Sequence, residues 1–359
     1  MITIPTILLI YHDADMVTLR TFEAINAMGQ ARVILADTNP VTASSNLSRV
    51  SIQPIKGKLN FKAIKSLKQA IRELSPDVVF AVSTSALSTA LFATRGTNTK
   101  VIGYRGTQAR VHRFDPTYRM ALLNKRVHHI VCETQDICQY LSRYIPQEKL
   151  SWCPKPYSTD WIKDAIVNPM SAWDTTSDTN EHFNLVYIGI TKGRPHKGLN
   201  YLIDAIQILN LTRPDIKPRL TVIGEADPSD INRATDNIKF TGNRPDAIHY
   251  LPSADLFVLP STRDASPRVV REAQACGLPC IVSDIPGARD LIIPDGPKQS
   301  GILVPPANPQ AITDAIAYIY DNPTLHLRMI DNARENITDN YNPDNYTAYL
   351  TKVMVNNDK

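Results

Sequence analysis

Short runs of apolar, often β-branched residues recur along the first part of the chain, at residues 6–11, 31–38, 77–83, 100–106 and 128–134. Each run is nearly continuous in apolar side chains, which is typical of strands that are buried on both faces of a sheet. Stretches with helical periodicity lie between them, at about residues 17–28, 60–75, 85–95 and 135–144. This alternation predicts a parallel sheet with helices on both of its faces.

The pattern weakens over residues 151–183, where Pro, Ser and Thr are frequent, and this segment predicts a connecting loop. Alternation then restarts, with apolar runs at 184–190, 219–226, 237–242, 254–261, 279–284 and 301–306 and a helix at about 198–212. Three helical stretches close the chain, at about 308–321, 324–339 and 343–355. The whole pattern predicts an α/β protein with two doubly wound, Rossmann-like domains that face each other across a cleft.

A chain of 359 residues is too long for one ordinary core, which also favours two domains. We expect an N-terminal domain at residues 1–155, a connecting loop at 156–183 and a C-terminal domain at 184–340. The last helix, within residues 341–359, is expected to pack back on the N-terminal domain.

The composition is globular, with 43% hydrophobic and 21% charged residues. No apolar run is long enough to span a bilayer, and the N-terminus lacks the basic region and cleavage site of a signal peptide. The five cysteines show neither metal-ligand spacing nor the density of a disulfide-rich protein. These features predict a cytoplasmic protein.

The positive charge is concentrated in the first part of the chain. Residues 1–150 contain 19 Lys and Arg against 10 Asp and Glu, a net charge of +9, whereas the remainder carries −5. This asymmetry predicts an anionic partner for the first domain, and chance surface composition is the alternative. No nucleic-acid-binding module is recognisable, so we expect no nucleic acid.

A basic amphipathic helix is expected at residues 60–77. Its apolar face carries Phe61, Ile64, Leu67, Ile71 and Leu74, and Lys62, Lys65, Lys68 and Arg72 lie off that face. Such a helix can lie on an anionic membrane, which would place the protein peripherally on the inner membrane face. An ordinary helix that covers the sheet is the alternative, and we favour it.

The sequence PSTRDASPRVVREAQACGLPCIVSD, residues 260–284, follows a predicted strand end, where ligands bind in such sheets. Ser266 predicts an N-cap, Pro267 the first helical position and Gly277 the end of the helix. The start of this helix is a potential anion site. Asp264 before it and Glu272 within it are suited to accept hydroxyl hydrogen bonds on either side of an anion. A capped surface helix with ion-paired arginines is the alternative.

The spacing from Asp264 to Glu272, followed by EAQACGLPCIVSD, resembles the E-x7-E signature of the retaining GT-B glycosyltransferases of family 4, the glycosyl transferases group 1. Three further segments resemble that family in the same order: 186–206 with its basic loop KGRPHKG, 237–261 and 300–316. The resemblance covers roughly residues 184–340. The N-terminal half matches only in its alternation of strands and helices.

The resemblance implies a role for each matching residue. Asp264 would contact hydroxyls of the donor sugar, and Glu272 would hold the ribose hydroxyls. The pyrophosphate would be held by Lys197 together with either Lys192 or Arg194. The remaining implied donor contacts are Arg244 near the base, Arg268, and the backbone around Ala265, Ser266 and Pro267.

The first domain is expected to supply the other half of the site from residues 102–119. This segment begins at a strand end and carries Arg105, Arg110, His112, Arg113, Asp115 and Arg119. In relatives, a histidine near this point contacts the donor sugar. Here Arg105 stands at the strand end and His112 is a second candidate, and with Asp264 and Lys197 they form the predicted catalytic set. A solvated basic loop is the alternative, and Lys155 near the domain junction is a weaker candidate.

The chain departs from the family pattern at three places. The first acid of the signature is Asp264 instead of Glu, which shortens its reach by one methylene. In KGRPHKG the usual Arg aligns with Lys192 by spacing and with Arg194 by identity. The Gly-rich turn after the first strand is replaced by YHDAD. Asp13 and Asp15 of that segment resemble a metal-binding DxD, which we interpret as a solvated loop because it lies outside the donor domain.

The sequence thus predicts transfer of a sugar from a nucleotide diphosphate sugar to a hydroxyl of a saccharide or lipid-linked acceptor, in cell-envelope polysaccharide synthesis. The resemblance implies retention of configuration by front-face attack, with no metal and no cofactor, because Lys and Arg neutralise the leaving phosphate. Two alternatives stay open: a non-catalytic nucleotide-sugar-binding partner subunit and a nucleotide-sugar epimerase of the same fold. A Rossmann dehydrogenase is disfavoured because no G-x-G-x-x-G follows a strand.

Overall fold

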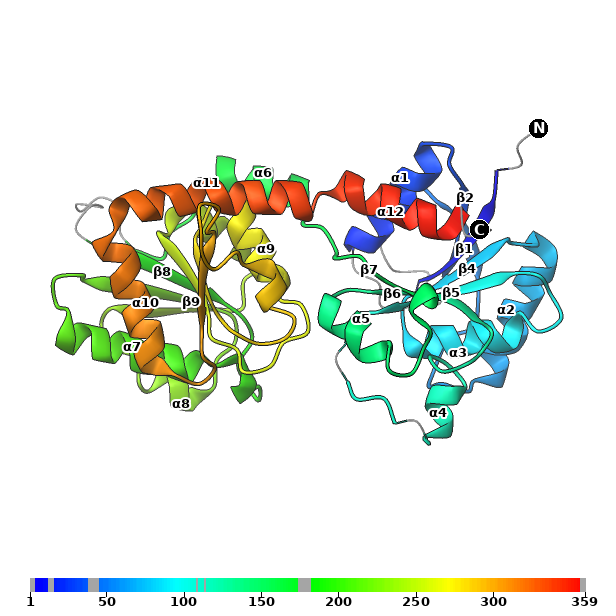
Figure 1. Ribbon diagram of the computed structural model, residues 1–359, viewed down its shortest axis with the longest axis horizontal. Coiled ribbons are helices and arrows are strands. Elements are labelled where there is room, and N and C mark those ends of the chain that lie inside the picture. The colour runs from blue at the N-terminus through cyan, green and yellow to red at the C-terminus, as the bar shows by residue number, and fades with distance from the viewer. Residues whose placement is uncertain are drawn as a thin grey trace. The chain divides into compact units, whose positions relative to one another are not determined.

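The computed structural model describes residues 4–11, 16–37, 45–107, 109–112, 114–173 and 182–355. The chain divides into two compact units (Figure 1). The first comprises Met1–Pro156 and Pro343–Lys359, and the second comprises Tyr157–Asn342. Each unit is built on its own parallel sheet, as the sequence predicted. No helix in the described part of the chain is both long and apolar enough to cross a bilayer.

The first unit contains a seven-stranded sheet with the order β3-β2-β1-β4-β5-β6-β7. The strand order reverses between β1 and β4, whose pairing aligns Ile7 with Val78. Four consecutive residues of β1, Ile7 to Ile10, are completely buried, as expected for a central strand with helices on both faces. The strands are β1 (Thr6–Tyr11), β2 (Arg32–Asp37), β3 (Ser48–Ser51), β4 (Val78–Ala81), β5 (Lys100–Arg105), β6 (Val127–Cys132) and β7 (Leu150–Trp152).

Six α-helices of the described first unit surround this sheet: α1 (Met16–Ala27), α2 (Phe61–Leu74), α3 (Thr84–Ala93), α4 (Pro116–Arg119), α5 (Gln135–Leu141) and α12 (Pro343–Val355), with a short 3-10 turn, η1 (Gln147–Lys149). Side chains of Asn60, Ser83 and Thr134 cap α2, α3 and α5. The C-terminal helix α12 packs with α1, and Leu350 and Met354 share one core cluster with Phe22 and Leu19.

Helix α2 covers the sheet with its apolar stripe. Ala63, Leu67, Ala70 and Ile71 are buried in the core of the first unit. This arrangement is the sheet-covering alternative that the sequence favoured. Phe61, the first residue of the helix, does not take part in this packing, because 75% of its surface is exposed.

The second unit contains a six-stranded sheet with the order β10-β9-β8-β11-β12-β13. Its order reverses between β8 and β11. The strands are β8 (Phe183–Ile188), β9 (Pro218–Ile223), β10 (Ile238–Gly242), β11 (Leu256–Leu259), β12 (Cys280–Ser283) and β13 (Gly301–Val304). The helices are α6 (Thr159–Val167), α7 (Leu199–Thr212), α8 (Pro228–Ile231), α9 (Arg268–Ala275), α10 (Pro309–Asp321) and α11 (Pro323–Asn340), with 3-10 turns η3 (Pro195–Lys197), η4 (Ala247–Ser253) and η5 (Arg289–Leu291).

The segment 156–183, expected as a connecting loop, contains helix α6. This helix belongs to the second unit and packs against η4. Ile162 and Ala165 are its buried residues. With so few inward positions over nine residues, the apolar periodicity of α6 is too short to stand out in the sequence.

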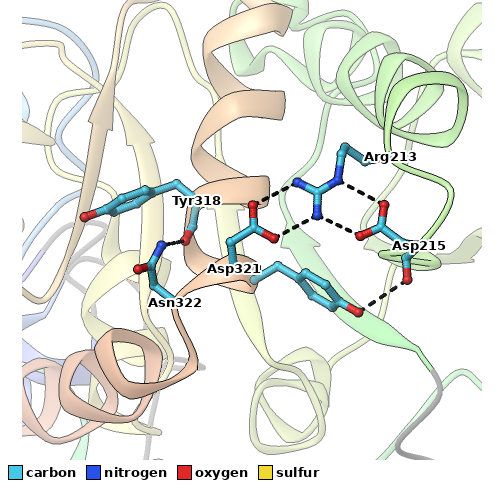
Figure 2. A network of polar contacts seen from close by, with 6 residues as sticks. Arg213, Asp215, Tyr318, Asp321 and Asn322 are labelled. Carbon is cyan, nitrogen blue, oxygen red and sulfur yellow. Dashed lines mark hydrogen bonds and ion pairs between the residues drawn. The ribbon is translucent and has the colours of Figure 1, made fainter.

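A polar network ties the ends of α7 and α10 in the second unit (Figure 2). Arg213, just after α7, makes paired hydrogen bonds to the carboxylates of Asp215 and Asp321, with N–O distances of 2.7–2.9 Å. The two carboxylates raise the pKa of Arg213, and Arg213 holds the pKa values of both acids below their ordinary value. The hydroxyl of Tyr320 donates to the Asp215 carbonyl at 3.3 Å. The network fixes helices that flank one face of the sheet.

Candidate functional site

Loops at the carboxyl ends of β8, β11 and β12 pack backbone against backbone in the second unit. Gly198 has a φ of +75°, and a Cβ at this residue would lie 2.0 Å from the carbonyl oxygen of Pro260. Gly287, with a φ of +89°, would likewise place a Cβ 2.0 Å from the carbonyl oxygen of Ala265. Only glycine fits such approaches. These contacts bring together chain segments that lie far apart in the sequence.

Lys197 and Asp264 meet at this edge of the sheet. Lys197 ends η3, Asp264 lies in the loop after β11, and the Lys197 Nζ to Asp264 Oδ2 distance is 2.6 Å. The side chains are 23% and 14% exposed. The backbone of Lys197 is also held, because its carbonyl accepts hydrogen bonds from the hydroxyls of Tyr187 at 3.3 Å and Ser261 at 3.4 Å. The pair is therefore a fixed, partly accessible unit.

Helix α9 begins later than the sequence predicted. Its first residue is Arg268, and Pro267 is the N-cap, with an extended ψ of 103°. The predictions that Ser266 caps the helix and that Pro267 is its first residue are wrong. The Ser266 hydroxyl instead accepts a hydrogen bond from Nη1 of the buried Arg271 at 2.8 Å. No side chain caps α9, so its start, four residues after Asp264, offers uncapped N–H groups.

Glu272 lies one turn into α9. Its Oε1 is 3.1 Å from Nε of Arg268, and its side chain is 13% exposed. Burial raises the pKa of Glu272, while Arg268 and Arg271 act in the opposite direction. Val270 and Ala273 on the same helix are buried in the core, which fixes the orientation of Glu272. Gly277, with a φ of +85°, ends the helix as predicted.

Three of the other predicted donor-binding cations are ion-paired in this structure. Lys192 lies 3.6 Å from a carboxylate oxygen of Glu225. Arg244 makes two hydrogen bonds to Asp246, at 2.9 and 2.8 Å, which engage the guanidinium expected near the base. Arg268 pairs with Glu272, as described above. Arg194 is exposed and has no side-chain partner among the described residues, and the choice between Lys192 and Arg194 stays a prediction.

The structure adds three residues that the sequence prediction did not include. Arg263 is exposed in the loop before Asp264. His196 lies beside Lys197, and its pKa is lowered first by burial and then by the charges of Arg263 and Lys197. The hydroxyl of Thr191 is buried and makes no hydrogen bond to the described residues. The only sequence signal for these three was their position in loops that follow predicted strands.

In the first unit, Arg105 ends β5 and points into the protein. Its side chain is 7% exposed, and its Nη2 donates to the carbonyl of Ala109 at 2.8 Å. Burial lowers its pKa. His112 is exposed, and Lys155 Nζ lies 4.5 Å from the centre of the Tyr104 ring. The catalytic roles of Arg105 and His112 stay predictions.

Several sequence predictions lie outside the described residues. These are the YHDAD segment beyond Tyr11, with Asp13 and Asp15, and the candidate Arg113. Among the described residues, no group of three or more His, Cys, Asp and Glu side chains comes together as a metal site requires. Metal independence stays a prediction.

Solved structures share the two-sheet architecture. A glycosyltransferase from Rickettsia africae matches with a TM-score of 0.80 at 16% identity, covering 99% of both chains. Anabaena HepE in complex with UDP matches with a TM-score of 0.74 at 16% identity, covering 98% of this chain and all of its own. The fold is that of the GT-B glycosyltransferases, as the sequence predicted.

The sequence of the second unit is similar to that of known glycosyltransferases. Residues 182–322 match the family model of the glycosyl transferases group 1. An uncharacterized glycosyltransferase of Haemophilus influenzae is 30% identical over 145 residues, which span 39% of this chain and 40% of that protein. An Escherichia coli UDP-Gal:alpha-D-GlcNAc-diphosphoundecaprenol alpha-1,3-galactosyltransferase is 34% identical over 101 residues, which span 28% of this chain and 25% of its own. These matches confirm the resemblance of the second unit to the glycosyl transferases group 1, and the chain spans less than half the length of these curated relatives.

Proposed function

We propose that this protein transfers a sugar from a nucleotide diphosphate sugar to a hydroxyl acceptor, with retention of configuration. One observation carries the proposal: Asp264, which is paired with Lys197, precedes the uncapped start of α9 by four residues, and Glu272 lies one turn into that helix. The cation and the anion-binding helix start suit the diphosphate of such a donor. The two carboxylates suit the hydroxyls of the sugar and of the ribose on either side of it.

The donor diphosphate is assigned to Lys197, Arg194 and the first N–H groups of α9. The Lys197 ammonium has three donor hydrogens, so it can keep its bond to Asp264 while it contacts a phosphate oxygen. Asp264 then accepts hydrogen bonds from hydroxyls of the donor sugar. Glu272 accepts those of the ribose, and Arg268 on the preceding turn favours its ionised form.

The reaction breaks the bond between the anomeric carbon and the terminal phosphate oxygen. The acceptor oxygen forms its bond to that carbon on the same face, and its proton passes to the departing phosphate. Lys197 and the start of α9 stabilise the charge that develops on this phosphate. The cationic groups of the site supply this stabilisation in our proposal, without a metal or a cofactor.

The names of related proteins suggest where to begin with substrates. The Escherichia coli relative is named for transfer from UDP-Gal to a diphosphoundecaprenol-linked sugar, and the Anabaena structure contains UDP. We therefore place UDP sugars first among the donors, and saccharides and lipid-linked saccharides first among the acceptors. Both assignments are proposals for this chain.

The first experiment is a thermal-shift panel with UDP, GDP, ADP, CMP and their common sugar conjugates, on the wild type and Glu272→Gln. A ligand at a hundred times its dissociation constant adds about 2.7 kcal/mol to the free energy of unfolding. This corresponds to a rise of several degrees, at roughly 2–4 °C per kcal/mol. We expect one nucleotide family to stand out and its effect to weaken in Glu272→Gln.

The donor identified in this way is then incubated with candidate acceptors, and products are separated by mass. Formation of a glycosylated acceptor with the donor's anomeric configuration supports the proposal. Binding without turnover on any acceptor would favour the partner-subunit alternative. A changed nucleotide sugar formed without an acceptor would favour the epimerase.

A further inference from the structure

Two phenylalanines are almost completely exposed at one edge of the first unit. Phe114 is 88% exposed and Phe61 is 75% exposed, and the neighbouring Leu59 is 46% exposed. Phe61 and Leu59 lie in the connection that follows β3, and Phe114 lies in the connection that follows β5. Both connections therefore leave the carboxyl edge of the same parallel sheet.

Lys58 joins the two connections. Its Nζ donates to the Thr117 hydroxyl at 2.6 Å and lies 4.4 Å from the centre of the Tyr118 ring. The carbonyl of Lys58 accepts a hydrogen bond from Ser88 on α3. These contacts hold the start of α2 beside the short helix α4, which Figure 1 shows at the lower end of the first unit. We name the surface formed by these residues the basic-aromatic tip. Its apolar members are Leu59, Phe61 and Phe114, and its exposed cations are Lys56, Lys62, Lys65, Arg110 and Arg119.

The connection that carries Phe114 is held by hydrogen bonds at several points. Arg105 donates to the carbonyl of Ala109, and the backbone N–H of Val111 donates to the Tyr140 hydroxyl at 2.8 Å. Val111 is itself buried. The Tyr118 hydroxyl donates to the Arg110 carbonyl at 2.8 Å. With both ends of the connection fixed in this way, the exposure of Phe114 is a property of the folded unit.

Positive charge surrounds these apolar side chains. The exposed cations of the tip are Lys56, Lys62, Lys65, Arg110 and Arg119. Residues 52–65 contain no acid, and Asp115 is the only acid in residues 109–119. Its carboxylate caps α4 by accepting from the Thr117 N–H at 2.8 Å. The tip therefore has a clear excess of positive charge.

We propose that the basic-aromatic tip docks the first unit onto a lipid bilayer that contains anionic lipids. Exposed aromatic side chains enter the boundary between headgroups and acyl chains, and Lys and Arg around them face the anionic headgroups. The sequence offered a membrane-facing apolar side of this helix as the less favoured alternative, and Leu67 and Ile71 of that side are buried in α2, whereas Phe61 is exposed. The contact assigned here uses only the start of α2 and the loop before α4.

This inference goes beyond the proposed transfer reaction and does not depend on it. Ligands of parallel α/β sheets bind at the carboxyl edge, which is also the edge that carries the tip. Docking would therefore bring this edge to a lipid-borne acceptor. Vesicle binding is measured without donor or acceptor, so its outcome is independent of catalytic activity.

The test is flotation of the purified protein with phosphatidylcholine vesicles and with vesicles that contain about one third phosphatidylglycerol. We expect the wild type to float with the anionic vesicles only, and less so at high salt. Phe61→Ser with Phe114→Ser removes the aromatic part of the tip, and Lys62→Glu with Lys65→Glu reverses part of its charge. Each double variant is expected to weaken binding by about tenfold or more.

Two matched controls distinguish the tip from general properties of the surface. Leu211→Ser with Leu327→Ser removes two apolar side chains that are 84% and 65% exposed elsewhere. Lys163→Glu with Lys352→Glu reverses two exposed helix lysines outside the tip. Both controls are expected to bind like the wild type. Circular dichroism verifies that each variant is folded.

Three outcomes would overturn the proposal. The first is a wild type that fails to float with anionic vesicles. The second is equal loss of binding in the tip variants and in the controls, which would indicate a general effect of charge or apolar surface. The third is binding of a single-stranded RNA that the same tip variants abolish while vesicle binding persists, which would assign the tip to nucleic acid.

Discussion

The carboxyl edges of the two sheets use the same architecture in different ways. At the edge of the second sheet, Lys197 is paired with Asp264 and Arg268 with Glu272, and glycines allow the loops to pack backbone against backbone. At the edge of the first sheet, the cations of the basic-aromatic tip accompany exposed phenylalanines on two segments, residues 52–65 and 109–119, that contain one acid between them. Paired charges in a close-packed edge suit a small ligand with both anionic and hydroxyl groups. Unmatched charge around apolar side chains suits an extended anionic surface.

The largest effect is expected from a substitution at the carboxyl edge of the second sheet. Lys197→Ala removes the cation that our proposal places at the departing phosphate, and we expect the catalytic efficiency to fall by about 10²–10³-fold. Lys192→Ala is the matched control, because Lys192 is exposed and lies further from its partner carboxylate. Steady-state kinetics with the identified donor measures both. Equal losses in the two variants would contradict the special position of Lys197.

A buried histidine makes the first unit sensitive to acid. His129 is 7% exposed and its Nε2 lies 2.7 Å from the Ser151 hydroxyl. Burial, with the nearby His128, lowers the pKa of His129 to about 4. The unfolded chain takes up a proton below about pH 6.5 and the folded chain does not, so stability is complete above that pH and declines towards pH 4. The total loss from this residue is about 3 kcal/mol.

The free energy of unfolding of the first unit is measured with denaturant between pH 7 and pH 4.5, for the wild type and for His129→Gln. The glutamine can still bond to Ser151 but does not titrate, so its stability should depend less on pH in this range. If the free energy of unfolding of His129→Gln changed with pH as steeply as that of the wild type, His129 would not be the source of the acid sensitivity. Glu272 in the second unit acts in the opposite direction, because a raised pKa contributes stability at low pH that is lost as pH rises through it.

Substitution of two glycines in one loop tests the close packing at the carboxyl edge of the second sheet. Gly198 and Gly193 both have a positive φ, but only at Gly198 would a Cβ meet other backbone atoms. Gly198→Ala should cost about 1–3 kcal/mol more than Gly193→Ala, because the loop must shift away from Pro260. Thermal unfolding measures the difference. Similar melting temperatures in the two variants would show that the loop accommodates the Cβ.

The smallest expected effect concerns the carboxylate of Glu272. Glu272→Gln exchanges a charged acceptor for a neutral one, and we expect donor affinity to fall by about tenfold. Burial raises the pKa of Glu272, so acidification protonates it earlier than an ordinary carboxyl group and weakens donor binding in the wild type. Calorimetric titration at several pH values measures both effects. A variant that keeps the pH dependence of the wild type would exclude Glu272 as its source.

The sequence predicted the elements that have long apolar patterns and missed the short ones. The central strands and helices such as α2, α7 and α10 follow strong periodicities. Strand β3 is almost entirely exposed, and α4 and α8 are four residues long, so none of them carries an apolar pattern of useful length. Local capping preference placed the start of α9 at Ser266, but the side chain of Arg271, five residues further on, donates to that hydroxyl instead.

The candidate site was predictable in its residues but not in its pairing. The resemblance selected Lys197, Asp264 and Glu272, and the structure brings the first two together across 67 positions of sequence. That contact depends on how the loops after β8 and β11 pack, which local patterns do not encode. The same limit applies to Arg105, whose position at a strand end suggested a substrate contact and whose side chain is directed to Ala109.

In the proposed site, the 2.6 Å contact between Lys197 and Asp264 couples the binding of an anion to the binding of a hydroxyl. Inorganic phosphate can accept a hydrogen bond from Lys197 but brings no sugar hydroxyl for Asp264. A nucleotide sugar brings an anion for Lys197 and hydroxyls for Asp264 in the same molecule, so both groups gain a partner at once. In our proposal the pair therefore favours ligands that carry both an anion and a hydroxyl, and we expect inorganic phosphate to compete poorly with the intact donor.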